Sequence, residues 1–260
     1  MQRVVSLVPS LTEAIATTAP RLLVGATAWC THPADLDVER IGGTKNPDVR
    51  RIVALAPDLV VANEEENRPA DLDALREAGV SVLVTQIRTL DEAFRELDRM
   101  LTVGCGLDRP GWLDAAEAAW AAVAAELGPP PSQGSDSSAA APAPSSRSAV
   151  IPIWRRPWMV LGRDTFAGDV LARLGVRNVY SDHAERYPKI PLPELLASGA
   201  ELVVLPDEPY AFSISDGPEA FPGLPAALVS GRHLTWYGPS LAEAPDVLRR
   251  QLRSGRSAHS

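Results

Sequence analysis

Aromatic side chains that could hold a flat ligand follow several stretches of the sequence that favour β-strands. Aromatic residues make up only 5% of the chain, so their positions are informative. Aromatic faces give a ligand with apolar surfaces a large contact area, and a few polar groups then suffice to orient it. Packing in a core is the alternative role. We expect six of them to line a ligand site: Trp29, Trp154, Trp158, Tyr187, Tyr210 and Phe212.

Charged and amide side chains lie next to these aromatics. Arg155 and Arg156 separate Trp154 from Trp158 and could pair with a ligand phosphate or carboxylate, because arginine binds such groups through two hydrogen bonds. Exposure to solvent is the alternative for at least one of them. Asn63–Asn67 (NEEEN) follows a predicted strand, and Asn63 and Glu65 are candidate ligand contacts. Three adjacent carboxylates also suit a water-exposed surface, or attraction of a cation or a basic partner.

Residues for catalysis or tight metal binding are scarce. The sequence has no GxSxG, P-loop, GxGxxG or HExxH motif, so we expect no enzymatic activity. Cys30 and Cys105 lack the spacing of a zinc site or a disulfide framework and are interpreted as buried thiols. His32 could bind a metal axially, but no second ligand stands at metal spacing. We therefore favour a hydrogen-bonded loop histidine and no protein-held metal or cofactor.

Composition and charge limit the partners. The formal charge is −8 and the sequence pI is about 5.1, which argues against nucleic acid or an anionic membrane as the main partner. With 45% hydrophobic residues the chain can form a globular core, and we expect a monomer. Residues 3–8 read as a strand directly after Met1 and Gln2, without a signal peptide before them. We therefore expect a cytoplasmic protein, or an extracytoplasmic one if the N-terminus is truncated.

The elements that must position these residues alternate between strands and helices. Strands are predicted at 4–7, 22–25, 58–62 and 80–84, with Ser10 and Glu13 as a capping box for the first helix. Helical spacing runs from residue 89 to 127, as one long helix or two joined near Gly104–Gly111. The second half repeats the pattern, with strands at 149–153 and 201–205 and a helix at 165–174. This order predicts an α/β fold with mainly parallel sheets.

The predicted domains are two lobes and their connection. They are an N-terminal α/β lobe (1–88), a connecting backbone helix (89–128), a flexible low-complexity linker (129–148) and a C-terminal α/β lobe (149–260). We expect the ligand cleft to lie between the lobes.

Several segments, taken in order, resemble the class III periplasmic binding proteins of ABC importers, also called helical backbone metal receptors. In the first half these are residues 3–13 (RVVSLVPSLTE), 41–47 (IGGTKNP) and 52–62 (IVALAPDLVVA). In the second half they are residues 164–166 (DTF), 175–179 (GVRNV), 187–188 (YP) and 194–196 (ELL). The resemblance implies two Rossmann-like lobes joined by a rigid helix. It also implies that cobalamin, haem or an iron-siderophore is bound without chemical change.

The resemblance adds Thr44 and Lys45, in the loop at 41–47, to the candidate ligand contacts. It also implies one docking carboxylate per lobe for an ABC permease, at positions that hold Pro69 and Pro193 in this chain. Glu66 and Glu194 lie close by in sequence. These prolines leave an alternative open, an intracellular corrinoid or metal-chelate carrier or sensor that is not coupled to a permease. An enzyme in the same cleft and a protein-docking module are the remaining alternatives.

Overall fold

The chain forms two compact units, each with its own parallel sheet. The computed structural model describes residues 2–128 and 146–254. Unit 1 comprises Met1–Ile87, Asp91–Ala116 and Trp236–Pro239, and unit 2 comprises Arg88–Leu90, Glu117–Thr235 and Ser240–Ser260. The predicted α/β fold with two mainly parallel sheets is confirmed.

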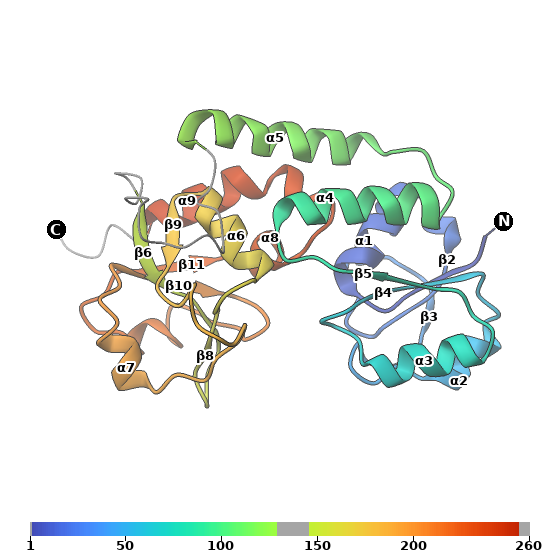
Figure 1. Cartoon of the computed structure of the whole chain (residues 1–260), viewed down its shortest axis with the longest axis horizontal. Coiled ribbons are helices and arrows are strands. Elements are labelled where there is room, and N and C mark those ends of the chain that lie inside the picture. The colour runs from blue at the N-terminus through green and yellow to red at the C-terminus, as the bar shows by residue number, and fades with distance from the viewer. Residues whose placement is uncertain (1, 129–145, 255–260) are drawn as a thin grey trace. The chain divides into compact units, whose positions relative to one another are not determined.

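The sheet of unit 1 has five parallel strands in the order β3-β2-β1-β4-β5. In Figure 1, α1 and α4 lie on one face of this sheet and α2 and α3 on the other. The strands are β1 (Val4–Ser6), β2 (Leu23–Ala26), β3 (Glu39–Arg40), β4 (Leu59–Asn63) and β5 (Val82–Thr85). The helices are α1 (Pro9–Thr18), the 3-10 turn η1 (Pro20–Leu22), α2 (Val49–Ala54), α3 (Pro69–Glu77) and α4 (Leu90–Arg99).

One core cluster of unit 1 lies between the sheet and the pair α2 and α3. Alternate residues of β1 and β4 face this side, since side chains alternate along a strand. Ile52 of α2 and Leu72 and Leu75 of α3 cover them. The buried residues of this cluster are Val5, Leu7, Ile41, Ile52, Val60, Ala62, Leu72 and Leu75.

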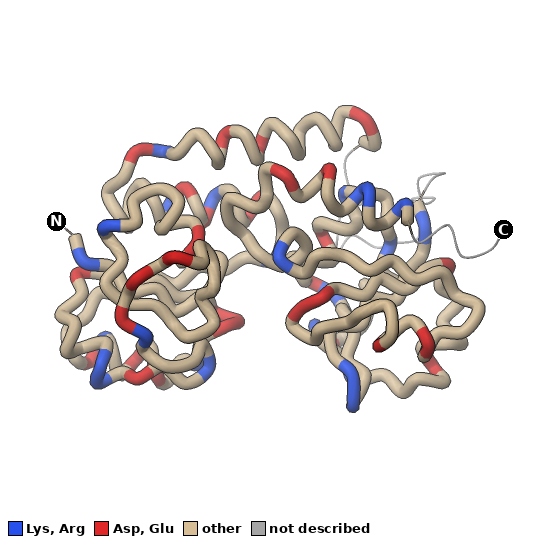
Figure 2. Tube along the Cα trace, turned by 180° about the vertical axis from the view of Figure 1, so that it is seen from behind, with Lys and Arg blue, Asp and Glu red and all other residues tan. Residues whose placement is uncertain are grey.

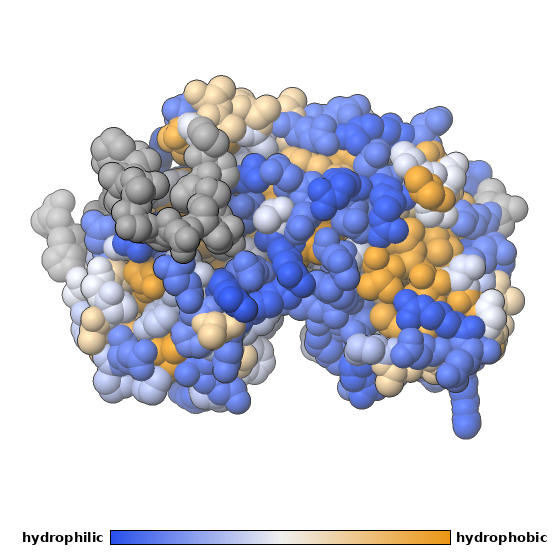
Figure 3. All heavy atoms as spheres, in the orientation of Figure 1, coloured by the Kyte–Doolittle hydropathy of each residue, from blue (hydrophilic) through white to orange (hydrophobic). Residues whose placement is uncertain are grey.

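Strand β5 is one of the two edge strands of the sheet in unit 1. Figure 3 shows apolar side chains gathered on the surface over this strand, and its residues Val82, Leu83 and Val84 are only half-buried. An exposed apolar edge invites pairing with another strand, and a charged side chain on the edge opposes it. Arg99 supplies that charge, because its Nη2 donates to the Val84 carbonyl at 2.9 Å.

The predicted connecting helix at 89–128 is two helices. Helix α4 continues into a π-helical turn, η2 (Met100–Gly104), and α5 (Gly111–Leu127) begins after a break. The single-helix interpretation is therefore wrong, and the alternative of two helices is correct. The break begins where Gly106 adopts a φ of +63°, a conformation that a helix does not continue.

The sheet of unit 2 has four parallel strands in the order β11-β10-β6-β9. The strands are β6 (Arg147–Val150), β9 (Val176–Asn178), β10 (Leu202–Pro206) and β11 (Ala226–Val229). The remaining elements are α6 (Phe166–Arg173), α7 (Leu192–Leu196), η3 (Pro218–Ala220), α8 (Gly231–Thr235), η4 (Pro239–Ala242) and α9 (Ala244–Ser254). Thr165 caps α6, since its hydroxyl accepts a hydrogen bond from the Gly168 N–H at 3.3 Å.

An antiparallel hairpin replaces the end of the strand predicted at 149–153. It pairs β7 (Pro152–Trp154) with β8 (Met159–Val160). The predicted linker ends too late, because residues 147 and 148 already belong to β6. The rest of that linker, at 129–145, lies outside the described residues.

The start of α1 also differs from the prediction. The helix begins at Pro9, which suits a first position because that residue needs no N–H donor there. Ser10 and Glu13 are buried within the helix, and the N-cap residue is Val8, so the predicted capping box is wrong. None of the helices in the described residues is long and apolar enough to cross a membrane.

Candidate functional site

Five aromatic side chains of unit 2 form a continuous set of ring contacts, here called the aromatic row: Trp154, Trp158, Tyr210, Phe212 and Phe221. Trp154 meets Tyr210 edge-on at 5.6 Å between ring centroids, and Tyr210 meets Phe212 at 4.6 Å. Trp158 stacks on Phe212 at 6.1 Å and meets Phe221 edge-on at 5.3 Å. Four of the six aromatics predicted from the sequence therefore come together, although Trp154 and Phe212 are far apart in the chain.

The row runs from the core of unit 2 to its surface. Phe212 and Phe221 are buried with the strands of the sheet, so their role is to support the others. Trp154 is 43% exposed and Tyr210 is half-buried. An outer end of exposed aromatic faces on a rigid inner base is suited to contact a large apolar surface.

The hairpin and one loop position the row. Trp154 ends β7 and Trp158 stands just before β8, while Tyr210 and Phe212 follow the carboxyl end of β10. Parallel α/β sheets bind ligands at the carboxyl ends of their strands. Sequence reasoning missed Phe221, which follows the short turn η3 rather than a strand.

Arg155 is held by carboxylates of its own chain. Its Nη1 pairs with Asp216 and its Nη2 lies 2.6 Å from Glu219, and its guanidinium lies 5.3 Å from the Trp158 ring centroid. The pKa values of Asp216 and Glu219 are both held below their ordinary range. The largest causes are the hydrogen bond from Tyr210 for Asp216 and the Gly217 N–H for Glu219.

The β7–β8 hairpin carries positively charged side chains at its tip. Figure 2 shows positive charge at the tip of the β7–β8 hairpin, where Arg155 and Arg156 lie. Arg156 is exposed and has a φ of +67°, a left-handed conformation that costs energy for a residue with a side chain. The guanidinium of Arg156 is therefore presented to solvent, whereas that of Arg155 is turned into the unit.

Tyr187 lies in a second loop of unit 2. The loop is fixed to the hairpin region by two backbone hydrogen bonds, from Gly162 N to Arg186 O at 2.8 Å and from Val160 N to Pro188 O at 3.1 Å. The Arg186 guanidinium lies 5.9 Å from the Tyr187 ring centroid, and the tyrosine is half-buried.

The candidates of unit 1 fall into exposed and buried groups. Trp29 is 68% exposed and lies beside the turn at residues 42–46, since a Cβ on Gly43 would stand 3.6 Å from its Nε1. Lys45 is exposed and its Nζ donates to the Glu65 carbonyl at 2.5 Å. Thr44 is buried, with its hydroxyl 3.5 Å from that of Thr27.

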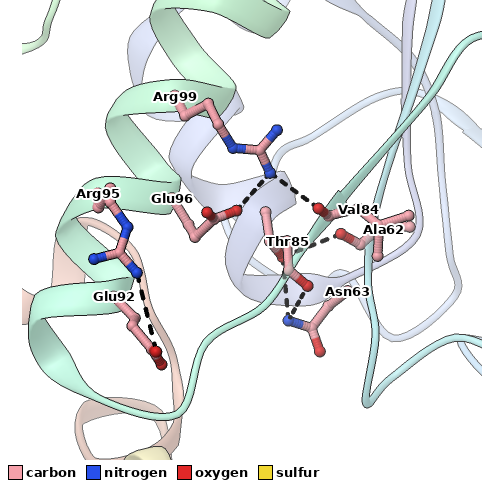
Figure 4. A network of polar contacts seen from close by, with 8 residues as sticks. All are labelled: Ala62, Asn63, Val84, Thr85, Glu92, Arg95, Glu96 and Arg99. Carbon is pink, nitrogen blue, oxygen red and sulfur yellow. Dashed lines mark hydrogen bonds and ion pairs between the residues drawn. The ribbon is translucent and has the colours of Figure 1, made fainter.

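Asn63 is buried and its side chain is occupied by the protein. Its Nδ2 donates to the carbonyl and the hydroxyl of Thr85 at 3.2 and 3.1 Å, and its Oδ1 accepts from the Glu65 N–H at 2.9 Å. Figure 4 shows the amide of Asn63 turned toward Thr85. Asn63 thus shapes the turn that carries Glu65.

The same network joins α4 to the edge of the sheet. Arg99 reaches from α4 to the Val84 carbonyl and to Glu96, at 2.9 and 2.5 Å (Figure 4). Thr85 in turn donates to the Ala62 carbonyl at 3.1 Å. These contacts fix the end of β5 relative to β4, which ends in Asn63.

The ring of His32 packs against an aromatic side chain. Its ring meets Trp236 edge-on at 5.3 Å, and its Nδ1 lies 3.2 Å from the Thr31 hydroxyl. No group of three or more His, Cys, Asp or Glu side chains able to hold a metal ion occurs within residues 2–128 and 146–254.

Glu66 is half-buried in the NEEEN turn. Burial raises its pKa, and the neighbouring Glu65 adds to this while Lys45 opposes it. All three glutamates of the turn are half-buried, so the turn is only partly exposed to water.

Asn67 is the residue of this turn that sequence reasoning missed. It is buried, and its Oδ1 accepts from the Asn63 N–H at 2.9 Å. Its Nδ2 donates to the carbonyls of Thr44 and Leu7, at 3.0 and 3.4 Å. It thereby joins the turn at residues 42–46 to the turn at residues 63–67. A second amide four residues after Asn63 was the available signal.

Replacing Asn67 by alanine is expected to lower the free energy of unfolding by about 1–3 kcal/mol, because a buried N–H and two carbonyls lose their partner. Urea unfolding followed by circular dichroism measures the loss. Asn46→Ala is the matched control, since Asn46 is exposed in the turn joined by Asn67, and we expect a change within about 0.5 kcal/mol. Equal effects of the two variants would contradict the role assigned to Asn67.

Comparisons with known proteins agree on one family. Residues 4–221 match the family described as periplasmic binding protein. A vitamin B12-binding protein of Pectobacterium carotovorum is 24% identical over 210 residues, which cover 80% of this chain and 72% of that protein.

Solved structures share the fold of the chain. The periplasmic vitamin B12 binding protein BtuF of Vibrio cholerae superposes with a TM-score of 0.75 at 18% identity, covering 98% of both chains. The periplasmic heme-binding protein RhuT from Roseiflexus sp. RS-1 superposes with a TM-score of 0.74 at 20% identity, also covering 98% of both.

Proposed function

The chain belongs to the periplasmic binding protein family, and on that premise we propose that it binds cobalamin, haem or a related metal chelate and releases it unchanged. The family is a class of binding proteins and not of enzymes. Its relatives at this distance include proteins named for vitamin B12 and for heme. Both ligands are large metal macrocycles with extended apolar faces.

The aromatic row carries the proposal. Trp154 and Tyr210 expose aromatic surface, Phe212 packs against Tyr210, and Phe221 packs against Trp158. A rigid aromatic surface costs little entropy on binding, so its area is available for the ligand. Arg156, which is exposed two residues after Trp154, would favour a ligand that carries carboxylates at its edge.

In unit 1, the exposed candidate residues are the ones that we expect to contact the ligand. We assign ligand contact to Trp29 and Lys45, which reach solvent beside the turn at residues 42–46. Thr44 and Asn63 are buried and support that turn and the next one. The prediction that the ligand lies between the lobes stays a prediction.

Calorimetric titration with cyanocobalamin, haemin and a ferric hydroxamate siderophore tests the proposal. At least one ligand is expected to saturate the protein at one site. Absence of a saturable response to all three would overturn the proposal.

Trp154→Ala is expected to weaken that binding by about 5- to 150-fold, because one stacked aromatic contributes about 1–3 kcal/mol. The matched control is Leu196→Ala, which removes a 47% exposed apolar side chain from α7 of the same unit. Its affinity should equal that of the unaltered protein. Equal loss in the two variants would remove Trp154 from the site.

A carrier or sensor without a permease is the second candidate function. It is favoured by Pro69 and Pro193, which occupy the first turns of α3 and α7 where the family resemblance places docking carboxylates. Glu194 is exposed in the first turn of α7, whereas Glu66 is half-buried. Copurification with an ABC permease would decide between the two functions, and loss of the complex in Glu194→Gln would identify the contact.

A further inference from the structure

The segment after β10 is joined to the β7–β8 hairpin by one arginine. Asp216 and Glu219 lie in this segment, and Arg155 of the hairpin pairs with both. The arginine side chain is only 15% exposed, whereas the two carboxylate side chains are 40% and 50% exposed. The guanidinium therefore lies beneath the carboxylates, against the Trp158 ring.

Asp216 also binds Tyr210, and so connects the tyrosine to Arg155. The Tyr210 hydroxyl donates to Asp216 Oδ2 at 2.7 Å. Asp216 is itself held in a turn, since its N–H donates to the Ser213 carbonyl at 3.3 Å and its carbonyl accepts from the Ser213 N–H at 3.0 Å. The phenol is thus fixed at its hydroxyl, and Phe212 and Trp154 fix its ring.

The pKa shifts of Tyr210 and Asp216 support the hydrogen bond between them. The hydrogen bond to Asp216 is the largest cause that raises the pKa of Tyr210, and the same bond lowers the pKa of Asp216. Both shifts favour an ionised carboxylate and a protonated phenol. The bond is therefore formed at neutral pH, is weakened when acid protonates Asp216 and is lost when base ionises Tyr210.

We propose that Arg155 is a positioning residue: it holds Asp216, which holds the Tyr210 hydroxyl, and so fixes the outer end of the aromatic row before the ligand arrives. This inference rests on the proposed function and replaces direct ligand contact by Arg155. A preorganised surface loses less side-chain entropy on binding, so the arginine strengthens binding without contacting the ligand. Arg156, not Arg155, is then the cation available to a ligand carboxylate.

Two substitutions separate positioning from direct contact. If Arg155 positions Tyr210, Arg155→Gln and Asp216→Asn each weaken binding by about 2- to 10-fold, and the double variant is no weaker than the worse single one. Cyanocobalamin and haemin should lose affinity alike, although only haemin carries free carboxylates.

Direct contact predicts the opposite sign for Asp216→Asn. That variant would release Arg155 from its partner and raise the affinity for haemin, while Arg155→Gln would lower it. Such a pair of results overturns the proposal. Arg163→Gln is the matched control, since Arg163 is 55% exposed and pairs with the adjacent Asp164 in the same unit.

A measurement without ligand completes the test. Amide hydrogen exchange is expected to be faster at residues 207–217 in both variants and unchanged in α5. Titration of tyrosine absorbance should show a lower pKa for one phenol in Asp216→Asn, which Tyr210→Phe identifies. Unchanged exchange in both variants refutes positioning. Because neither measurement needs a ligand, they decide the role of Arg155 even if the titrations find that no chelate binds and the proposed function fails.

Discussion

Replacing Asp169 by alanine is expected to lower the free energy of unfolding by about 3 kcal/mol, because it removes one partner of a buried ion pair. Asp169 is buried in α6, and its Oδ2 accepts from Arg173 Nε at 2.8 Å. The same oxygen accepts from the Leu90 N–H at 2.9 Å, which is the first N–H of α4. The substitution thus also removes the partner of a helix N-terminus.

Urea unfolding followed by circular dichroism measures this loss. Asp73→Ala is the control, since Asp73 is 62% exposed and pairs with Arg76 on the surface of α3, where an ion pair contributes about 0–1 kcal/mol. Asp169→Asn should fall between the two, because the amide oxygen still accepts from Leu90 while the charge is lost. A loss below about 1 kcal/mol for Asp169→Ala would show that the pair does not anchor α4.

Replacing Gly162 by alanine is expected to displace the loop that carries Tyr187, at a cost of about 3 kcal/mol in stability. A Cβ at this position would stand 2.1 Å from the Glu185 carbonyl oxygen and 3.1 Å from that of Arg186. Both are backbone atoms, so no change of side-chain rotamer relieves the contact. The backbone hydrogen bond from Gly162 to Arg186 would also be disturbed.

Gly111→Ala is the matched control for that substitution. Gly111 begins α5, and a Cβ there would have no atom within 4 Å. Alanine should leave stability unchanged or raise it by up to about 1 kcal/mol, since it favours a helix over glycine. If Gly162→Ala unfolds at the same urea concentration as Gly111→Ala, the loop can move away freely and Gly162 does not seat it.

The fold was predictable because its strands are apolar runs and its helices have a clear period. Residues 58–62 and 201–205 nearly coincide with β4 and β10. The hairpin was not predictable, since strands of three and two residues are too short for alternation to appear. The capping box at the start of α1 failed because the helix already starts at Pro9, so that the N-cap is Val8 and not Ser10.

The site was predictable in its aromatic residues and not in its charges. Tyr210 and Phe212 follow the parallel strand β10, as the sequence predicted, whereas Trp154 and Trp158 belong to the antiparallel hairpin. The partners of Arg155 lie some sixty residues further along the chain, and neither Asp216 nor Glu219 follows a local pattern that marks it. The ion pair therefore depends on tertiary structure, as does the burial that turns Asn63 from a ligand candidate into a support.

Residues 236–239 belong to unit 1 although they come near the end of the chain, which delays the completion of unit 1 during protein synthesis. Trp236 and Tyr237 are both buried, Trp236 lies against His32, and a Cβ on Gly238 would stand 3.1 Å from the Ser10 carbonyl oxygen. The first unit therefore stays incomplete on the ribosome until residue 239 has left the exit tunnel, when most of unit 2 has already emerged. A polypeptide released after α5 would lack these residues, and we expect it to be a target for proteases and chaperones.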